Sequence, residues 1–519
     1  MSNKNNAKSP IYNTLLISIG TTSSKILGFI REVVIAAFFG ASYFVDAYLI
    51  AMLVPNALFS VVGGALTTTV IPLITEYKEK IGQKSVLTLL NTVTTVMAVV
   101  LAVLVLIGEV FAFYIIKLVA PGFEGEVLEL AVYLSRIMFP MMLFMGLAGL
   151  GTGILQSQRR FIYPAFIGIP YNLIIIASLF LFSKMWGITG LAVGTLLGIF
   201  SQWLFQIPDL RKAGFKFKLK LDFSHPGFRK MGVLIIPVII GSGAGQINLL
   251  VDRMLASGLV EGSISALNYA SKVNTLAFGI IAVSVASAMY PEFSQAAVLK
   301  DNDKFVSSVR RTFNGLLLII LPFTLGMIIL REPLIRLFFE RGAFDEVATS
   351  LTVFALFFYA LGLPALALRE VILRAFYSLQ DTMTPMIIGV GTVVLNIILN
   401  LILVRYLAHG GLALATSISI TIGLFVLLWY LRKKVGKMGG SKILISGMKI
   451  ALATSVMSIV VYGLLTSLSN IIAKGNMGDI IILFTCGLVG AGIYFVIIKL
   501  LKVEEFEWLV AKVKMRFNR

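Results

Sequence analysis

The sequence predicts an all-α integral membrane protein with fourteen transmembrane helices, arranged as two six-helix lobes followed by two further helices. Three observations predict this class. Of the 519 residues, 58% are hydrophobic and 13% are charged, and the mean hydropathy is +0.94, which is far outside the range of soluble globular domains. Apolar runs of about 20 residues or more, long enough to cross a bilayer, recur along the chain. The two parts of the chain also resemble each other as a direct repeat.

Each predicted span is an apolar run bounded by polar or charged residues. The N-terminal run contains charges and has no small-residue cleavage site, so we expect it to remain as the first helix. The fourteen predicted spans are 11–39, 43–74, 86–118, 127–155, 161–183, 187–208, 228–257, 262–293, 305–331, 346–378, 384–406, 411–432, 442–468 and 478–501.

Lysine and arginine gather in alternate loops, such as EYKEKIGQK and RKKVGKMGGSK, whereas the loop APGFEGEVLE on the other side is acidic. Because basic residues mark cytoplasmic loops, this asymmetry predicts that both termini are cytoplasmic. The same asymmetry accounts for the net charge of +19, so no nucleic acid partner is expected. The predicted cytoplasmic parts include the segment 1–10, the basic linker 211–227 and the tail 502–519.

A direct repeat divides the chain. QSQRRFIYPAFIGIPYNLIII resembles YSLQDTMTPMIIGVGTVVLNIIL, and Arg31 corresponds to Arg253. An offset of six helices leaves both halves in the same orientation, which indicates parallel repeats related by a pseudo-twofold axis along the membrane normal. In such folds the substrate binds between the repeats and access alternates between the two sides. The predicted parts are an N-lobe at 11–210, a C-lobe at 228–435 and two added helices at 436–501.

Charged residues within the predicted spans are the candidate substrate-binding residues. An ionisable residue at membrane depth costs about 2.5–3.5 kcal/mol or more, so it normally faces a cavity or a partner. The net sign of this set is positive, which suits a phosphate-bearing or otherwise anionic substrate. Structural alternatives are a headgroup contact for Arg31, a helix-terminus charge for Asp46 and a local ion pair between Arg253 and Asp252. The candidates are Lys25, Arg31, Glu32, Asp46, Arg253 and Lys272.

A second polar set combines Asp252 with Asn396, Asn400 and Thr416. Asn396 and Asn400 are four residues apart and therefore share one helix face. One carboxylate with amide and hydroxyl oxygens suits a hard cation such as Na⁺. The alternative, which the spacing alone favours, is a cluster of hydrogen bonds between helices.

The sequence contains no pattern of an enzyme. There is no phosphate-binding GxxxxGK[ST] loop and no zinc-ligand spacing, and the two histidines are not placed to act with a nucleophile. We therefore expect a transporter, with no cofactor apart from a sodium ion that could couple to transport.

Several motifs resemble the MurJ (MviN) family of lipid II flippases, in the superfamily that also holds MATE multidrug exporters and polysaccharide flippases. They include SKILGFIREVVIAAFFGAS, VDAYLIAMLVPN, SALNYASKVN and LFFERGAFD. The resemblance implies a multi-pass plasma-membrane protein that moves the undecaprenyl-diphosphate-linked peptidoglycan precursor from the inner to the outer leaflet. It also implies lipid II and membrane lipids as partners, and cell-wall synthases as candidate partners.

The resemblance also implies roles for individual residues. Lys25 and Arg31, followed by Glu32, match the cationic cavity residues of the family, while Asp46 and Lys272 match further family motifs. Lysine in place of arginine keeps the charge but loses the bidentate geometry. An arginine that relatives often carry after PN is absent from PNALFSVVGG. The resemblance implies two further binding regions: a sodium site at Asp252, Asn396, Asn400 and Thr416, and a groove for the polyprenyl tail at 436–501.

Other functions compete with this one. A flippase of the same fold could carry another lipid-linked saccharide, for teichoic acid, capsule or spore wall. A cation-coupled multidrug exporter would be expected to have twelve helices and an acidic or aromatic cavity, and a scaffold for cell-wall synthases would need no buried charge. The basic pair in the first helix, together with Lys272, favours lipid II.

Overall fold

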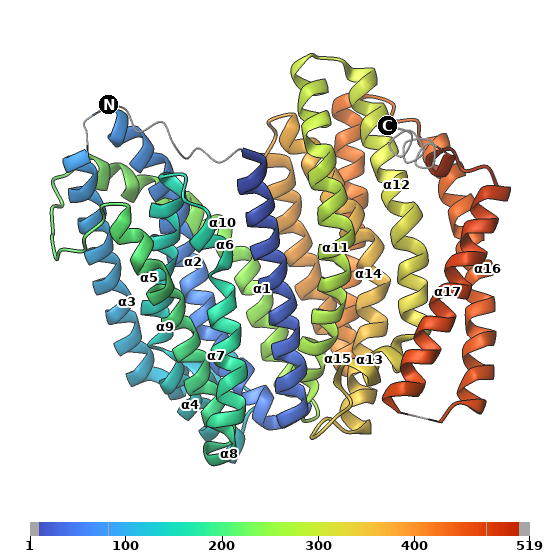
Figure 1. Ribbon diagram of the computed structural model, residues 1–519, viewed down its shortest axis with the longest axis horizontal. Coiled ribbons are helices and arrows are strands. Elements are labelled where there is room, and N and C mark those ends of the chain that lie inside the picture. Colours follow the sequence, from blue (N-terminus) through green and yellow to red (C-terminus); the bar gives the residue numbers. More distant parts are fainter. Residues whose placement is uncertain (1–9, 81–82, 474, 508–519) are drawn as a thin grey trace. The chain divides into compact units, whose positions relative to one another are not determined.

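The chain folds almost entirely into α-helices, as predicted. The computed structural model describes residues 10–80, 83–473 and 475–507, and these contain no β-strand (Figure 1). The chain divides into two compact units, of which the first ends at Ile264 and the second begins at Ser265. The predicted all-α fold class is therefore confirmed.

The first unit contains ten helices within the described residues. They are α1 (Pro10–Phe39), α2 (Tyr43–Lys80), α3 (Gln83–Val119), α4 (Gly125–Met138), α5 (Met141–Ser157), α6 (Ile162–Phe166), α7 (Gly168–Leu181), α8 (Ser183–Trp186), α9 (Ile188–Lys212) and α10 (Pro226–Ala256).

Between Ser263 and Leu500, the described part of the second unit contains seven helices. They are α11 (Ser263–Val298), α12 (Asn302–Ile329), α13 (Arg331–Phe339), α14 (Glu346–Ser378), α15 (Met383–Val435), α16 (Gly440–Ile471) and α17 (Asn476–Leu500).

All fourteen predicted spans fall on helices, with three differences in how the helices are divided. The span 127–155 is interrupted at Phe139 and Pro140, and the span 161–183 is divided among α6, α7 and α8. The spans 384–406 and 411–432 join in α15 across Ala408, which has a non-helical backbone. The short helix α13 was not predicted, because its nine residues are too few for a membrane span.

Within the described ranges, eleven helical stretches are long and apolar enough to cross a membrane, judged by length and composition. Because α15 holds two predicted spans, these stretches cover twelve of the fourteen. The remaining two predicted spans are α1, which carries Lys25, Arg31 and Glu32, and α10. The predicted count of fourteen is compatible with this arrangement.

In the first unit, α2 packs against α4, α5 and α10, while α1 packs against α7, which in turn packs against α9. The turn between α10 and α11 closes tightly on two other loops. A Cβ atom at Gly262, where φ is +82°, would lie 2.3 Å from the carbonyl oxygen of Ala41. A Cβ atom at Gly122 would lie 2.5 Å from the Cα atom of Gly258. Glycine is therefore required at both close approaches.

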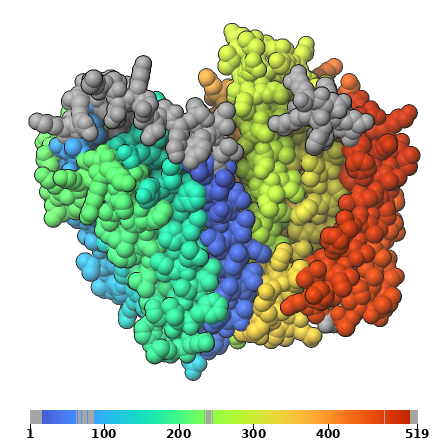
Figure 2. All heavy atoms as spheres, in the orientation of Figure 1, coloured from blue at the N-terminus to red at the C-terminus, as the bar shows by residue number. Residues whose placement is uncertain are grey.

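In the second unit, α14 packs against α15 and α12, and the last two helices pack together against α12 and α13. Figure 2 shows α16 and α17 in red beside the yellow side chains of this unit. The Arg336 guanidinium of α13 donates to Asp479 of α17 at 2.8 Å, and the Asp479 side chain is only 2% exposed. This ion pair fastens the start of α17 to the rest of the unit.

Candidate functional site

The Arg31 side chain is largely buried in the first unit. Its Nη2 atom lies 2.6 Å from Glu32 Oε1, and its Nη1 atom donates to Asn172 Oδ1 at 3.1 Å. The guanidinium carbon also lies 5.2 Å from the centre of the Tyr171 ring, a cation–π distance. The Arg31 and Glu32 side chains are 13% and 7% exposed. The charge of Arg31 is thus balanced by a carboxylate, an amide and an aromatic face.

Asn172 connects this charged group to the backbone of two helices. Its Nδ2 atom donates to the carbonyl of Ser24 on α1 at 3.2 Å and to the carbonyl of Gly168 on α7 at 2.7 Å. The side chain can therefore hold its oxygen toward Arg31 while α1 and α7 stay in register. Sequence analysis missed Tyr171 and Asn172, although a polar residue inside an apolar span was a signal that could have found them.

Lys25 has a different environment, because its side chain is exposed. Exposed polar residues Ser18 and Thr22 lie seven and three positions before it, so the three share one face of α1. Within the described part of the chain, no carboxylate pairs with Lys25. An exposed stripe of Ile19 and Ile26 runs beside this polar face. This part of α1 can thus offer an uncompensated cation next to an apolar surface.

The Asp46 carboxylate contacts the turn before α11. Its Oδ2 atom accepts a hydrogen bond from the backbone N–H of Gly262 at 2.9 Å, and the residue is 4% exposed. The neighbouring Tyr43 N–H donates to Glu261 Oε1 at 3.1 Å. Asp46 therefore helps to fix the turn between α10 and α11 against the start of α2.

The remaining candidates of the charged set are half-buried. Arg253 donates from Nη1 to the carbonyl of Ile264 at 3.0 Å, across the turn that joins α10 to α11. Arg253 is thus positioned to stabilise this turn. Asp252 lies beside it on α10, and Lys272 lies on α11 in the second unit.

Asn396, Asn400 and Thr416 come together inside α15. Asn400 Nδ2 donates to Asn396 Oδ1 at 2.9 Å, and Asn396 Nδ2 lies 3.4 Å from both Thr416 Oγ1 and Ser419 Oγ. Asn396 and Asn400 are 3% and 0% exposed. The cluster therefore contains hydrogen bonds between helical segments. Such bonds are the alternative to a sodium site that was given in the sequence analysis.

Hard cations bind amide and hydroxyl oxygens, so the types of oxygen atom in this cluster suit a sodium ion. Three of the four predicted ligands thus lie on α15 of the second unit, and Asp252 is a residue of the first unit. Among the described residues, no group of three or more His, Cys, Asp or Glu side chains is placed to hold a metal ion.

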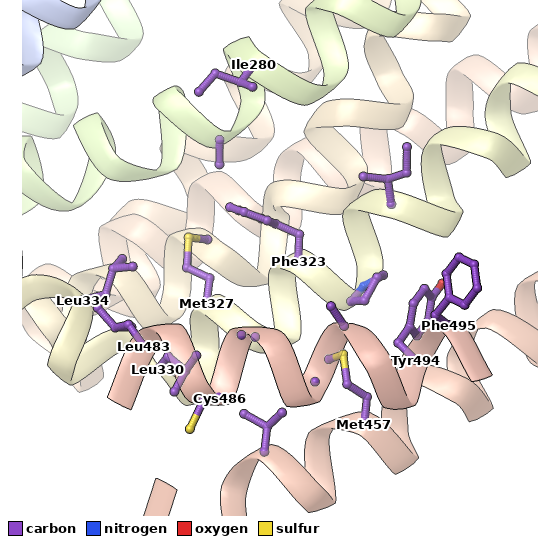
Figure 3. Close-up of a pocket in the computed structure, with 18 of the residues that line it drawn as sticks. Ile280, Phe323, Met327, Leu330, Leu334, Met457, Leu483, Cys486, Tyr494 and Phe495 are labelled. Carbon is purple, nitrogen blue, oxygen red and sulfur yellow. The ribbon is translucent and has the colours of Figure 1, made fainter. Parts of the chain in front are cut away.

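A large apolar pocket lies between the last two helices and the rest of the second unit. Its volume is about 830 Å³. Figure 3 shows Leu483, Cys486 and Tyr494 of α17 on one side of it and Phe323 and Met327 of α12 on the other. Such a volume lies in the range of ligand pockets, and an almost wholly apolar lining suits a hydrocarbon chain.

Comparisons with known proteins agree with this fold. The family model described as lipid II flippase MurJ matches residues 35–482. A probable lipid II flippase MurJ from Buchnera aphidicola subsp. Schizaphis graminum is 34% identical over 426 residues, which cover 81% of this chain and 83% of that protein. A probable lipid II flippase MurJ from Rickettsia prowazekii is 32% identical over 95% of this chain and 98% of its own length.

Solved structures give the same relationship. A structure of lipid II flippase MurJ in an inward closed conformation is 31% identical, has a TM-score of 0.79 and matches over 93% of this chain and 98% of that chain. An inward-facing MATE family multidrug resistance transporter of the MOP superfamily has a TM-score of 0.65 at 16% identity, over 82% of this chain and 98% of that one. The second likeness shows a shared fold alone.

The buried pair of Arg31 and Glu32 gives a stability prediction. Glu32→Gln should lower the free energy of unfolding by about 3 kcal/mol, because it leaves the buried guanidinium without its carboxylate. The measurement is denaturant or thermal unfolding in detergent micelles. The matched control is Glu332→Gln, since Glu332 pairs with Arg336 at 2.7 Å but is 60% exposed, and its loss should have little effect.

The double variant Arg31→Gln/Glu32→Gln should be more stable than Glu32→Gln alone, because it leaves no unpaired charge. If Glu32→Gln proved as mild as Glu332→Gln, the carboxylate would not be needed to balance the buried guanidinium.

Proposed function

We propose, from the premise that this chain belongs to the MurJ family of lipid II flippases, that α1 supplies the cations that bind the lipid II headgroup. As a member of this family the protein is a lipid II flippase, a multi-pass transporter of the bacterial membrane and not an enzyme. Lipid II is therefore its substrate. The diphosphate is the strongest charge of that substrate, so it requires cationic groups at the binding site.

The observation that carries the proposal is the exposure of Lys25. A lysine in a predicted membrane span would avoid hydrocarbon, so an exposed amino group there requires water or an anion nearby. Ser18 and Thr22 on the same face supply further hydrogen bonds for a hydrated headgroup. Lysine acts as a mobile point charge, which allows one phosphate oxygen to be exchanged for another during translocation.

Arg31 has a second role in this proposal. Its guanidinium is held by Glu32 and Asn172 in the structure, so a phosphate must compete with these partners to contact it directly. Arg31 then contributes positive potential near the site and orients α1 against α7. Asp46 and Arg253 both bond to the turn before α11, and their proposed role is to hold that turn in place.

The proposal predicts that charge at position 25 is essential. Lys25→Gln should reduce lipid II translocation by about 10- to 100-fold, as expected for the loss of a charge-assisted hydrogen bond, whereas Lys25→Arg should keep most of the activity. The measurement is lipid II that becomes accessible to an enzyme added outside cells or vesicles. The control is Lys184→Gln, which removes another exposed lysine of the same unit. Unchanged translocation by Lys25→Gln would refute the assignment.

The apolar pocket of the second unit is proposed to hold the polyprenyl tail of lipid II. The tail is a long hydrocarbon, and the pocket is lined by apolar side chains of α11, α12, α16 and α17. Glycines at 326, 487 and 490 leave space along it. Gly490 lies against Val461, whereas a Cβ atom at Gly326 or Gly487 would meet no atom within 4 Å.

Filling the pocket should therefore slow translocation. Gly487→Phe places a ring in the pocket and should reduce translocation about tenfold while the protein stays folded, because burial of the tail then loses apolar area. The matched control is Gly492→Phe, since Gly492 is an exposed glycine of α17 with equally open surroundings but does not line the pocket. Equal translocation rates for the two variants would show that the tail does not use this pocket.

Sodium coupling is proposed at the cluster of Asn396, Asn400 and Thr416, to which the family resemblance adds Asp252 as a carboxylate ligand. What supports it is the ligand set, which combines the buried amide oxygens of Asn396 and Asn400 with the half-buried hydroxyl of Thr416. The two asparagines provide no negative charge, so the site depends on Asp252 for electrostatic attraction.

A sodium-dependent cycle predicts faster lipid II translocation in vesicles with a sodium gradient than with a potassium gradient. Asn396→Ala should abolish the difference, and Ser417→Ala, which removes a hydroxyl bonded to the Phe358 carbonyl of α14, should keep it. Equal rates in the two salts for the parent protein would exclude the coupling.

Orientation and protein partners complete the proposal. The lysine and arginine asymmetry of the loops supports an orientation with both termini in the cytoplasm. The family resemblance supports flipping from the inner to the outer leaflet. Association with cell-wall synthases stays a prediction from the family resemblance.

A further inference from the structure

The segment between α9 and α10 has no regular secondary structure up to a turn at Phe223, and residues 216–223 read KFKLKLDF. Lysine and apolar residues alternate along its first part. In an extended chain successive side chains point to opposite faces, so Lys216, Lys218 and Lys220 share one face while Phe217, Leu219 and Leu221 share the other. A loop that only connected two helices would not need this alternation.

The backbone of this segment is docked on α3. The Lys218 N–H donates to Asn91 Oδ1 at 2.8 Å, and the Lys220 N–H donates to Thr95 Oγ1 at 3.3 Å. Two residues of extended chain advance by about 6.7 Å, and four residues of helix by about 6 Å, so the two pairs are in register. The extended backbone therefore uses helix side chains as hydrogen-bond partners.

Both ends of the segment are also fixed. Phe215 is buried, and its N–H donates to the carbonyl of Leu210 at 3.0 Å. At the other end His225 is 8% exposed, caps α10 by accepting from the Gly227 N–H at 3.1 Å, and lies against the Tyr77 ring. The segment is therefore held at a defined position on the first unit.

Its apolar side chains nevertheless remain exposed. Phe217, Leu219, Leu221 and Phe223 are 51%, 81%, 57% and 57% exposed, and the three lysines are exposed as well. A contiguous row of large apolar side chains on a fixed backbone indicates a surface that is covered by the lipid bilayer or by another molecule.

The position of the segment along α3 identifies what covers it. The large exposed apolar side chains of α3 run from Val99 to Leu118, which is about the length that crosses the hydrocarbon core. Thr95 precedes Val99 by four residues, or about 6 Å along the helix. The segment therefore lies just outside the hydrocarbon core, at the depth of the lipid headgroups.

We propose that residues 215–223 form an interfacial anchor that inserts its apolar row into the bilayer surface and binds anionic phospholipid headgroups through Lys216, Lys218 and Lys220. Phenylalanine and leucine side chains suit the headgroup boundary, and lysines extend from it toward phosphates. Anionic lipids attract basic segments at this depth. The anchor is independent of the lipid II site on α1 and would fix the beginning of α10 at the membrane surface.

The test places a fluorophore at the centre of the apolar row. In a Cys486→Ala background, Leu219→Cys is labelled and the protein is reconstituted into phosphatidylcholine vesicles with or without phosphatidylglycerol. Quenching by lipids that carry a spin label near the headgroup reports contact with the bilayer surface. We expect strong quenching that increases with phosphatidylglycerol.

Three charge variants decide whether the lysines are responsible. The triple variant Lys216→Gln/Lys218→Gln/Lys220→Gln should lose the increase caused by phosphatidylglycerol, and the corresponding triple change to arginine should keep it. The backbone contacts to Asn91 and Thr95 remain in both, whereas the bond from Lys220 Nζ to Thr88 Oγ1 at 3.2 Å is removed with the lysine. A charge-matched control, Lys300→Gln/Lys304→Gln/Lys433→Gln, removes three exposed lysines elsewhere and should also keep the increase.

Absence of lipid quenching at position 219 would overturn the anchor and indicate that water or a protein partner covers the row. Retention of the phosphatidylglycerol effect in the glutamine variant would overturn the role of the lysines. An equal loss in the charge-matched control would assign the effect to total charge rather than to this segment.

Discussion

The burial of the Arg31 guanidinium is the constraint that organises the first unit around α1. Moving an ion out of water costs several kcal/mol, and only close partners offset that cost. Glu32 supplies the charge, and Asn172 supplies an oxygen from α7. Asn172 can do so only if α1 and α7 approach closely, and they do: a Cβ atom at Gly168 would lie 2.8 Å from Ser24 Cβ. The charge therefore requires the close packing of these two helices.

The same constraint separates the two cations of α1. Arg31 is committed to protein partners, whereas Lys25, six residues earlier, is exposed and has no described carboxylate beside it. A substrate that carries a diphosphate gains most from a cation that has not already been neutralised. A rigid guanidinium suits the structural task, and a flexible ammonium suits an anion that moves. The difference between the proposed roles of Lys25 and Arg31 thus follows from environment and not from residue type alone.

Hydrophobic runs were sufficient to predict the all-α membrane fold and to place every predicted span on a helix, because membrane helices must satisfy their backbone hydrogen bonds internally. They could not predict α13, which is short and carries Arg331 and Arg336 among apolar residues. They could not distinguish Lys25 from Arg31 either, since the partner that holds Arg31 lies on α7, 141 residues further along the chain. The pairing of Asn396 with Asn400 was accessible from the sequence because it is local to one helix face.

The basic linker shows where charge patterns alone are ambiguous. Lysines in a loop satisfy the rule that orients membrane proteins, whatever the shape of the loop. That rule does not explain why apolar residues alternate with Lys216, Lys218 and Lys220, or why Asn91 and Thr95 of α3 accept from the linker backbone. An extended backbone needs partners for its N–H groups, and no strand among the described residues supplies them. The side chains of α3 meet part of this need at interfacial depth, which leaves the apolar row facing the lipid. The same lysines can thus orient the chain and hold it at the surface of the leaflet.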